Sequence, residues 1–208
     1  MKAIKYPILL LILLSSNAYS QSGSEQTILF FGDSITAGLG VDKQEAFPAI
    51  IQDKIDSLEL NYDVINGGLS GETSAGGLRR INWVLQRPVD IMFLELGGND
   101  GLRGIELSST RANLQGIIDA ALDKNPDMKV VVVGMQVPPN LGTEYTAEFT
   151  DIYPELAQKN NLKLIPLIMN NLAGSKELMQ GDGIHPTPQG HRLLADTIWD
   201  TLKPMITK

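Results

Sequence analysis

The sequence of 208 residues contains no cysteine and only two histidines, His185 and His191. The lack of cysteine excludes a thiolate nucleophile, a thiolate metal site and a disulfide scaffold. Histidine acid–base chemistry near neutral pH can depend only on these two residues. Positive charge is also scarce, because 17 Lys and Arg stand against 24 Asp and Glu, for a net charge of −7. We therefore expect no nucleic-acid partner.

Long apolar runs are lacking beyond the N-terminus, and so are internal repeats and linker-like stretches. Apolar residues make up 43% and charged residues 20% of the chain, which is an ordinary globular balance. The length suits one domain. We expect a single domain over residues 21–208, preceded by a targeting segment.

The first 20 residues have the pattern of a secretory signal peptide. Lys2 and Lys5 precede an apolar run over residues 8–14, and the small residues Ala18 and Ser20 follow, two positions apart. The run is shorter than the roughly 20 apolar residues that span a bilayer. We predict cleavage after Ser20, a periplasmic or secreted protein, and no stable membrane anchor afterwards. An uncleaved anchor is the alternative.

Apolar, β-branched runs alternate with amphipathic stretches along the rest of the chain. The predicted strands are Thr27–Phe31, Tyr62–Asn66, Asp90–Leu96, Lys129–Met135 and Lys163–Pro166. Helical periodicity covers 47–58, 78–85, 114–122, 149–156 and 194–202. This alternation predicts an α/β fold, a three-layer α/β/α sandwich whose five-stranded parallel sheet has the flavodoxin-like order 2-1-3-4-5. In such a sheet the site lies beyond the carboxyl ends of the strands.

Four polar segments rich in glycine are expected to meet at that edge. An acyl-transfer site needs a nucleophile, a base, an orienting group and donors for the oxyanion. Ser34 is the candidate nucleophile, His185 the candidate base, and Asp182 the group that orients the imidazole. The backbone N–H groups of Ser34 and Gly71 and the side chain of Asn99 are the candidate oxyanion donors. Such a site requires no cofactor.

Asp182 and His185 are also compatible with a metal pair. Two ligands do not make a site, and the chain has no cysteine to complete one, so we expect no metal. The second histidine, His191, is interpreted as a surface or helix-packing residue. Arg103 is interpreted as a solvated loop arginine, with contact to an anionic head group as the alternative.

Three acidic residues lie close to the candidate site residues in the sequence. Glu95 interrupts an apolar strand, so it is either paired support for the Asn99 side chain or a plain surface acid. Asp33 and Asp100 are interpreted as hydrogen-bonding scaffolds of their loops, with no acid or base role.

Taken together, these segments resemble the SGNH, or GDSL, hydrolase family. The matching blocks are Gly32-Asp33-Ser34-Ile35, Gly71, Gly97-Gly98-Asn99-Asp100 and Asp182-Gly183-Ile184-His185-Pro186, in the family's order. Further segments are similar to the periplasmic thioesterase, lysophospholipase and arylesterase branch. These segments are Ser70–Ser74, Glu95–Gly104 and Ile152–Ala157.

The resemblance implies the SGNH hydrolase fold and a serine hydrolase that cleaves ester and thioester bonds of single-chain acyl substrates through an acyl-Ser34 intermediate. It also implies that Gly71 and Asn99 are oxyanion donors and that Asp182 orients His185. A carbohydrate O-acetylesterase of the same family is the alternative, and a non-catalytic binding module on this fold is a further one. The chain lacks the Gly-x-Ser-x-Gly elbow and the glycine motifs that bind nucleotides.

Apolar residues on two loops predict where an acyl chain binds. Leu102 and Ile105 follow Asn99, and Val137 and Leu141 lie in a proline-containing loop after the fourth strand. We expect a shallow groove with no separate lid domain, occupied by a small-molecule acyl ester or thioester. The alternative is that these residues only pack the loops together. No heptad or large apolar stripe demands a partner, so we expect a monomer.

Overall fold

The computed structural model describes residues 25–207. The predicted signal peptide and the cut after Ser20 lie outside these residues. Within the described part of the chain, none of the helices combines the length and apolar character needed to cross a bilayer.

Five parallel strands form one central sheet in the order β2-β1-β3-β4-β5. The strands are β1 (Gln26–Gly32), β2 (Tyr62–Asn66), β3 (Ile91–Glu95), β4 (Lys129–Val133) and β5 (Lys163–Ile165). The predicted sheet order is confirmed. β3, β4 and β5 each end one or two residues earlier than predicted. At the end of β4, a side chain on Gly134 would lie 1.8 Å from the Pro166 carbonyl oxygen, so glycine permits the two chains to approach there.

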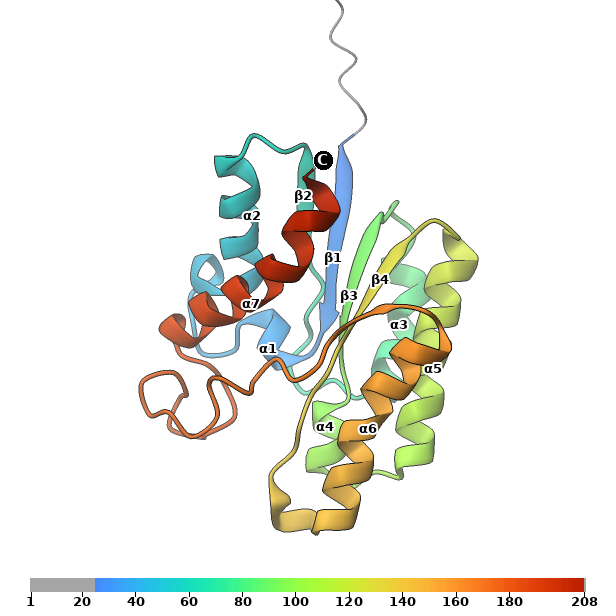
Figure 1. Cartoon of the computed structure of the whole chain (residues 1–208), viewed down its shortest axis with the longest axis vertical. Helices are drawn as coiled ribbons and strands as arrows, with labels where there is room; N and C mark the ends of the chain where they lie inside the picture. The colour runs from blue at the N-terminus through green and yellow to red at the C-terminus, as the bar shows by residue number, and fades with distance from the viewer. Residues whose placement is uncertain (1–24, 208) are drawn as a thin grey trace, which may run out of the picture.

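Helices cover both faces of the sheet, as predicted (Figure 1). One face carries α2 (Phe47–Ser57) and α7 (Pro188–Ile206). The other face carries α3 (Ser74–Val84), α5 (Leu107–Lys124) and α6 (Thr143–Lys159). Short helices α1 (Ser34–Ala37) and α4 (Gly98–Leu102) directly follow the ends of β1 and β3, and the 3₁₀ turns η1 (Lys43–Glu45) and η2 (Pro139–Leu141) complete the elements.

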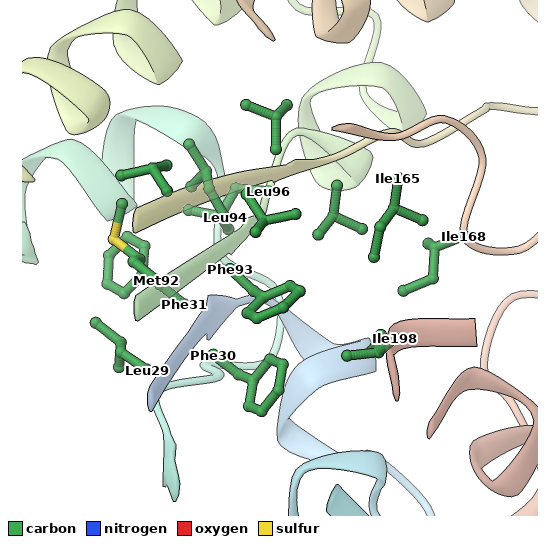
Figure 2. Close-up of a cluster of buried hydrophobic side chains, with 14 of the residues drawn as sticks. Leu29, Phe30, Phe31, Met92, Phe93, Leu94, Leu96, Ile165, Ile168 and Ile198 are labelled. Carbon is green, nitrogen blue, oxygen red and sulfur yellow. The ribbon is translucent and has the colours of Figure 1, made fainter. Parts of the chain in front are cut away.

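Alternate side chains of the strands build a core on each face of the sheet. Phe30 and Phe93 are register partners on neighbouring strands, and their ring centroids lie 4.9 Å apart. Both face the α2–α7 layer, where Phe30 meets Phe47 edge-on and Ile198 lies nearby (Figure 2). Leu29, Phe31 and Met92 point to the opposite layer. Strands buried on both faces explain the continuous apolar runs in the sequence.

Residues 166–187 join β5 to α7 without a helix or strand, and we refer to them as the connection segment. It runs along the carboxyl edge of the sheet, as the long orange loop of Figure 1 shows. The Ile168 N–H donates to the Gly134 carbonyl (3.0 Å), and Gln180 Nε2 donates to the carbonyls of Leu39 and Pro186 (both 2.8 Å). These bonds hold the segment beside the end of β1.

Candidate active site

Ser34 occupies the turn from β1 into α1. Asp33 caps this helix, because its Oδ1 accepts from the Ile35 N–H at 3.0 Å. Ser34 is the first residue of α1, so its own N–H has no acceptor within the helix. The short turn thus presents a hydroxyl and a backbone donor together at the edge of the sheet.

A chain of hydrogen bonds joins Ser34 to the connection segment. Ser34 Oγ lies 2.8 Å from His185 Nε2, and His185 Nδ1 lies 2.6 Å from Asp182 Oδ2. A carboxylate only accepts, so Nδ1 carries the proton, and Nε2 is left to accept from the serine hydroxyl. Ser34 and His185 are 151 positions apart in the sequence, yet their side chains are in direct contact.

Asp182 is held as an anion by its own loop. Its other oxygen, Oδ1, accepts from the backbone N–H groups of Ile184 (2.9 Å) and His185 (3.0 Å). The hydrogen bond from the His185 ring and these two backbone bonds lower the pKa of Asp182 to about 2. The imidazole therefore faces an ionised carboxylate over the whole neutral range.

Asn99 and Gly71, the other two candidate oxyanion donors, lie on α4 and on the loop between β2 and α3. Asn99 lies in the first turn of α4, and its Nδ2 donates to Asp33 Oδ2 at 3.1 Å. An amide nitrogen has two hydrogens, so a second N–H remains for a substrate. Gly71 has a φ of +78°, in the region that favours glycine, and a Cβ there would meet Arg103 Nη2 at 3.9 Å. The Arg103 side chain connects this loop to Asn99.

Two buried carboxyl groups lie behind the nucleophile. Glu95 Oε2 accepts from the Asp33 N–H (3.3 Å) and from Thr36 Oγ1 (2.6 Å). Glu95 is therefore not a surface acid. It supports the α1 turn and reaches Asn99 only through Asp33, which contacts that amide. Burial raises the pKa of Asp33 to about 6, and burial together with the Asp33 charge raises the pKa of Glu95 well above its usual range.

A cavity of about 530 Å³ opens beside Ser34, Asn99 and His185. Leu102 and Val137 line it, as the sequence analysis expected for an acyl groove. Ile105 and Leu141 do not. The carbonyl of Ile105 accepts from Tyr145 on α6 (2.8 Å), and Leu141 lies exposed in η2.

The cavity is larger on the side of the connection segment than the sequence indicated. Met135 follows β4, and apolar residues of the connection segment complete the wall. The latter are Met169, Ala173, Met179 and Ile184. No periodicity marks these residues in the sequence, because the segment that carries them forms no helix or strand. Only their position between the fifth strand and the histidine block offered a signal.

The remaining polar candidates are also placed. Asp100 accepts from the Ser74 N–H (2.8 Å) and hydroxyl (2.5 Å), which confirms its scaffold role. His191 is buried and accepts from the Phe47 N–H at 3.3 Å, so it packs helices and is not a surface residue. Arg103 is exposed, as expected for a solvated arginine, and its guanidinium in addition donates to Gly71 and Asn99.

Over residues 25–207, no three or more His, Asp or Glu side chains gather in a way that would hold a metal ion.

Residues 30–193 match the GDSL-like lipase/acylhydrolase family. Esterase TesA of Pseudomonas aeruginosa is 36% identical over 90% of this chain and 92% of its own length. Thioesterase 1/protease 1/lysophospholipase L1 of Escherichia coli K12 is 34% identical, over 96% of this chain and 92% of its own.

A solved structure agrees with these matches. The psychrotrophic esterase EstA from Pseudoalteromonas sp., solved with monoethylphosphonate as inhibitor, superposes with a TM-score of 0.82. It is 32% identical, and the match covers 88% of this chain and 100% of that one. The expected family and fold are confirmed. The chain belongs to the GDSL-like lipase/acylhydrolase family and is an ester hydrolase.

Proposed function

We propose that this chain hydrolyses carboxylic ester and thioester bonds of single-chain acyl substrates through an acyl-Ser34 intermediate. The observation that carries the proposal is the hydrogen-bonded chain from Ser34 through His185 to Asp182, which borders an apolar cavity. A nucleophile, a base and an orienting acid in this order are what acyl transfer requires.

Acylation begins when Ser34 Oγ attacks the carbonyl carbon and its proton passes to His185 Nε2. The carbonyl oxygen becomes an oxyanion, which accepts hydrogen bonds from the N–H groups of Ser34 and Gly71 and from Asn99 Nδ2. The imidazolium formed is stabilised by the Asp182 carboxylate at 2.6 Å. Collapse of the intermediate breaks the bond to the alcohol or thiol, which leaves with the proton from Nε2.

Deacylation repeats these steps with water. His185 Nε2 accepts a proton from water as the water oxygen attacks the acyl-serine carbonyl. The same donors hold the second oxyanion, and the proton returns to Ser34 Oγ as the carboxylic acid leaves. No step needs a group beyond this chain, its substrate and water.

The cavity wall favours an acyl chain over a sugar. Its lining is dominated by aliphatic and methionine side chains, including Leu102, Val137 and Met179. Burial of methylene groups against such a wall is favourable, whereas a carbohydrate would bury hydroxyl groups that need partners. The lysophospholipase and thioesterase names of the Escherichia coli relative fit single-chain acyl substrates. A carbohydrate O-acetylesterase is the competing function, and the acyl-chain preference separates the two.

The experiment is p-nitrophenyl butyrate hydrolysis with four variants. We expect Ser34→Ala and His185→Ala each to lose ~10⁴-fold or more in kcat, because the two residues act as one unit. The controls are Ser57→Ala and His191→Asn, which change a serine on α2 and the buried histidine and should keep kcat at pH 7. A serine-directed phosphonate should label Ser34 in mass spectrometry. Labelling elsewhere, or an active Ser34→Ala protein, contradicts the mechanism.

We further propose that the protein is exported and acts as a monomer in the periplasm or outside the cell. The N-terminal pattern of Lys2, Lys5 and the apolar run supports export, with cleavage after Ser20. Mass spectrometry of the protein from a periplasmic extract should give a chain that begins at Gln21. A full-length chain in the membrane fraction would instead indicate an uncleaved anchor.

A further inference from the structure

Arg103 makes two contacts that the proposed mechanism does not use. It follows α4 directly, four residues after Asn99, so the two side chains share one face of the short helix. Its Nη2 donates to the Gly71 carbonyl at 3.0 Å and to Asn99 Oδ1 at 3.4 Å. The two acceptors belong to the two loops that supply oxyanion donors in addition to Ser34.

The Asn99 amide is consequently held at both ends. Asp33 Oδ2 only accepts, so it requires the nitrogen of the amide on its side. The Arg103 guanidinium only donates, so it requires the oxygen on the other side. Only one of the two amide orientations satisfies both neighbours, and in that orientation Nδ2 faces the α1 turn that carries Ser34.

The Gly71 loop needs a similar restraint. Glycine restricts the backbone least of all residues, and the φ of +78° at Gly71 is one of several that it can adopt. On one side the loop is held by Glu72, which is paired with Arg80. On the other side, the bond from Arg103 to the Gly71 carbonyl fixes the peptide next to the donating N–H.

We propose that Arg103 is a positioning residue that aligns the Asn99 and Gly71 donors with each other for the oxyanion. This inference rests on the proposed function, because it assumes that both groups act as oxyanion donors. Donors that are aligned before reaction cost no reorganisation in the transition state, so the effect of Arg103 belongs in kcat and not in substrate binding. The competing role is direct contact with an anionic head group, which would belong in KM.

The test is Arg103→Met, which keeps an unbranched side chain and removes the charge and both bonds. Asn99→Ala removes a donor outright and should lower kcat ~10²–10³-fold. We expect Arg103→Met to lower kcat for the neutral p-nitrophenyl butyrate about tenfold, with KM within about twofold, because the donors remain but lose their alignment. Arg111→Met is the matched control, since Arg111 is bonded to Glu155 on the α5–α6 surface.

A double variant separates positioning from a general charge effect. In an Asn99→Ala background, Arg103→Met should lower kcat by clearly less than in the wild type, because one of the two groups it aligns is gone. Equal losses in both backgrounds would overturn the proposal. So would an unchanged kcat on the neutral ester combined with a raised KM on a carboxylate-bearing ester.

Two controls distinguish a failure of the proposed Arg103 role from a failure of the proposed function. The unfolding midpoint of Arg103→Met should match that of the wild type, because the side chain is exposed. If Asn99→Ala retains full activity, the proposed function is at fault. If Asn99→Ala and Ser34→Ala lose activity while Arg103→Met does not, only the role of Arg103 is wrong.

Discussion

At the scale of single residues, the site depends on two buried carboxyl groups, Asp33 and Glu95, that lie behind Ser34. Glu95 accepts from the Asp33 N–H, so the two acids are neighbours, and the charge of Asp33 disfavours ionisation of Glu95. Burial raises the pKa of Asp33 to about 6, so at pH 7 it is mainly an anion that accepts from Asn99. Burial and the Asp33 charge raise the pKa of Glu95 well above its usual range, which favours the neutral form of this acid.

Glu95→Gln tests this assignment. Glu95 Oε2 accepts two bonds and Oε1 has no partner among the described residues, so a glutamine can accept the same bonds and place its NH₂ where the acid proton lies. The variant should keep kcat/KM at pH 7 within about twofold. A raised pKa in the folded state means that the folded wild type holds a proton which the unfolded chain releases above pH ~4.5.

The contribution of Glu95 to the stability of the wild type therefore falls as pH rises above that value, whereas the glutamine of the variant does not titrate. The free energy of unfolding of Glu95→Gln, relative to that of the wild type, should grow by up to ~1.4 kcal/mol per pH unit as the pH rises above ~4.5, measured by urea unfolding. Glu59→Gln, at an exposed position, serves as the control and should show no such trend. A constant difference across this pH range would mean that Glu95 is ionised in the folded protein.

At the scale of elements, the cavity is built by the short helices α1 and α4 and by segments without regular structure at the carboxyl edge of the sheet. The turn after β1 provides Ser34, whereas the connection segment provides both His185 and much of the apolar wall. Methionine is flexible and polarizable, and Met135, Met169 and Met179 can adapt to acyl chains of different shape. One segment thus couples the base to the acyl site.

Acyl-chain preference is the test at this scale. Each buried methylene contributes ~0.8 kcal/mol at most, so kcat/KM for p-nitrophenyl esters should rise up to ~4-fold per methylene from acetyl to medium chains and then level off. Leu102→Asp should flatten this rise without abolishing acetyl-ester hydrolysis. Leu141→Asp is the matched control, because the two leucines are similarly exposed, at 41% and 39%, and only Leu102 lines the cavity.

A flattened profile in both leucine variants would mean that the leucine at the cavity has no special part in chain binding. A wild-type profile that peaks at acetyl and falls steeply would favour the O-acetylesterase alternative.

At the scale of the whole molecule, the sheet order and the site's location were predictable because they follow from periodicity and general rules of α/β folds. The order 2-1-3-4-5 and the meeting of Ser34, Asn99 and His185 were anticipated in this way. Contacts between loops were not predictable. Glu95 supports the α1 turn directly, and Arg103 bridges two loops, because pairing across a sheet edge leaves no periodic trace in the sequence.

The last helix, α7, packs against α2, and its buried histidine, His191, makes the stability of the fold sensitive to acid. His191 Nδ1 accepts from the Phe47 N–H, its ring stacks on Phe47, and Nε2 has no partner among the described residues. Burial, helped by the charge of His185, lowers the pKa of His191 to about 4. Between pH 6.5 and 4 the unfolded chain therefore binds a proton that the folded chain does not, so the contribution of His191 to stability falls as pH falls.

His191→Asn should reduce this acid sensitivity, because an asparagine oxygen can accept from the Phe47 N–H and does not titrate. We expect the variant to be less stable at pH 7, by about 1–2 kcal/mol, since a buried ring is lost. Its free energy of unfolding should nevertheless fall less than that of the wild type from pH 7 to pH 5, where the wild type loses up to ~1.4 kcal/mol per pH unit through this residue. Urea unfolding at the two pH values measures both quantities. Parallel losses in the two proteins would place the acid sensitivity elsewhere. Because Glu95 acts in the opposite direction, Glu95→Gln should steepen the acid side of the stability curve and His191→Asn should flatten it.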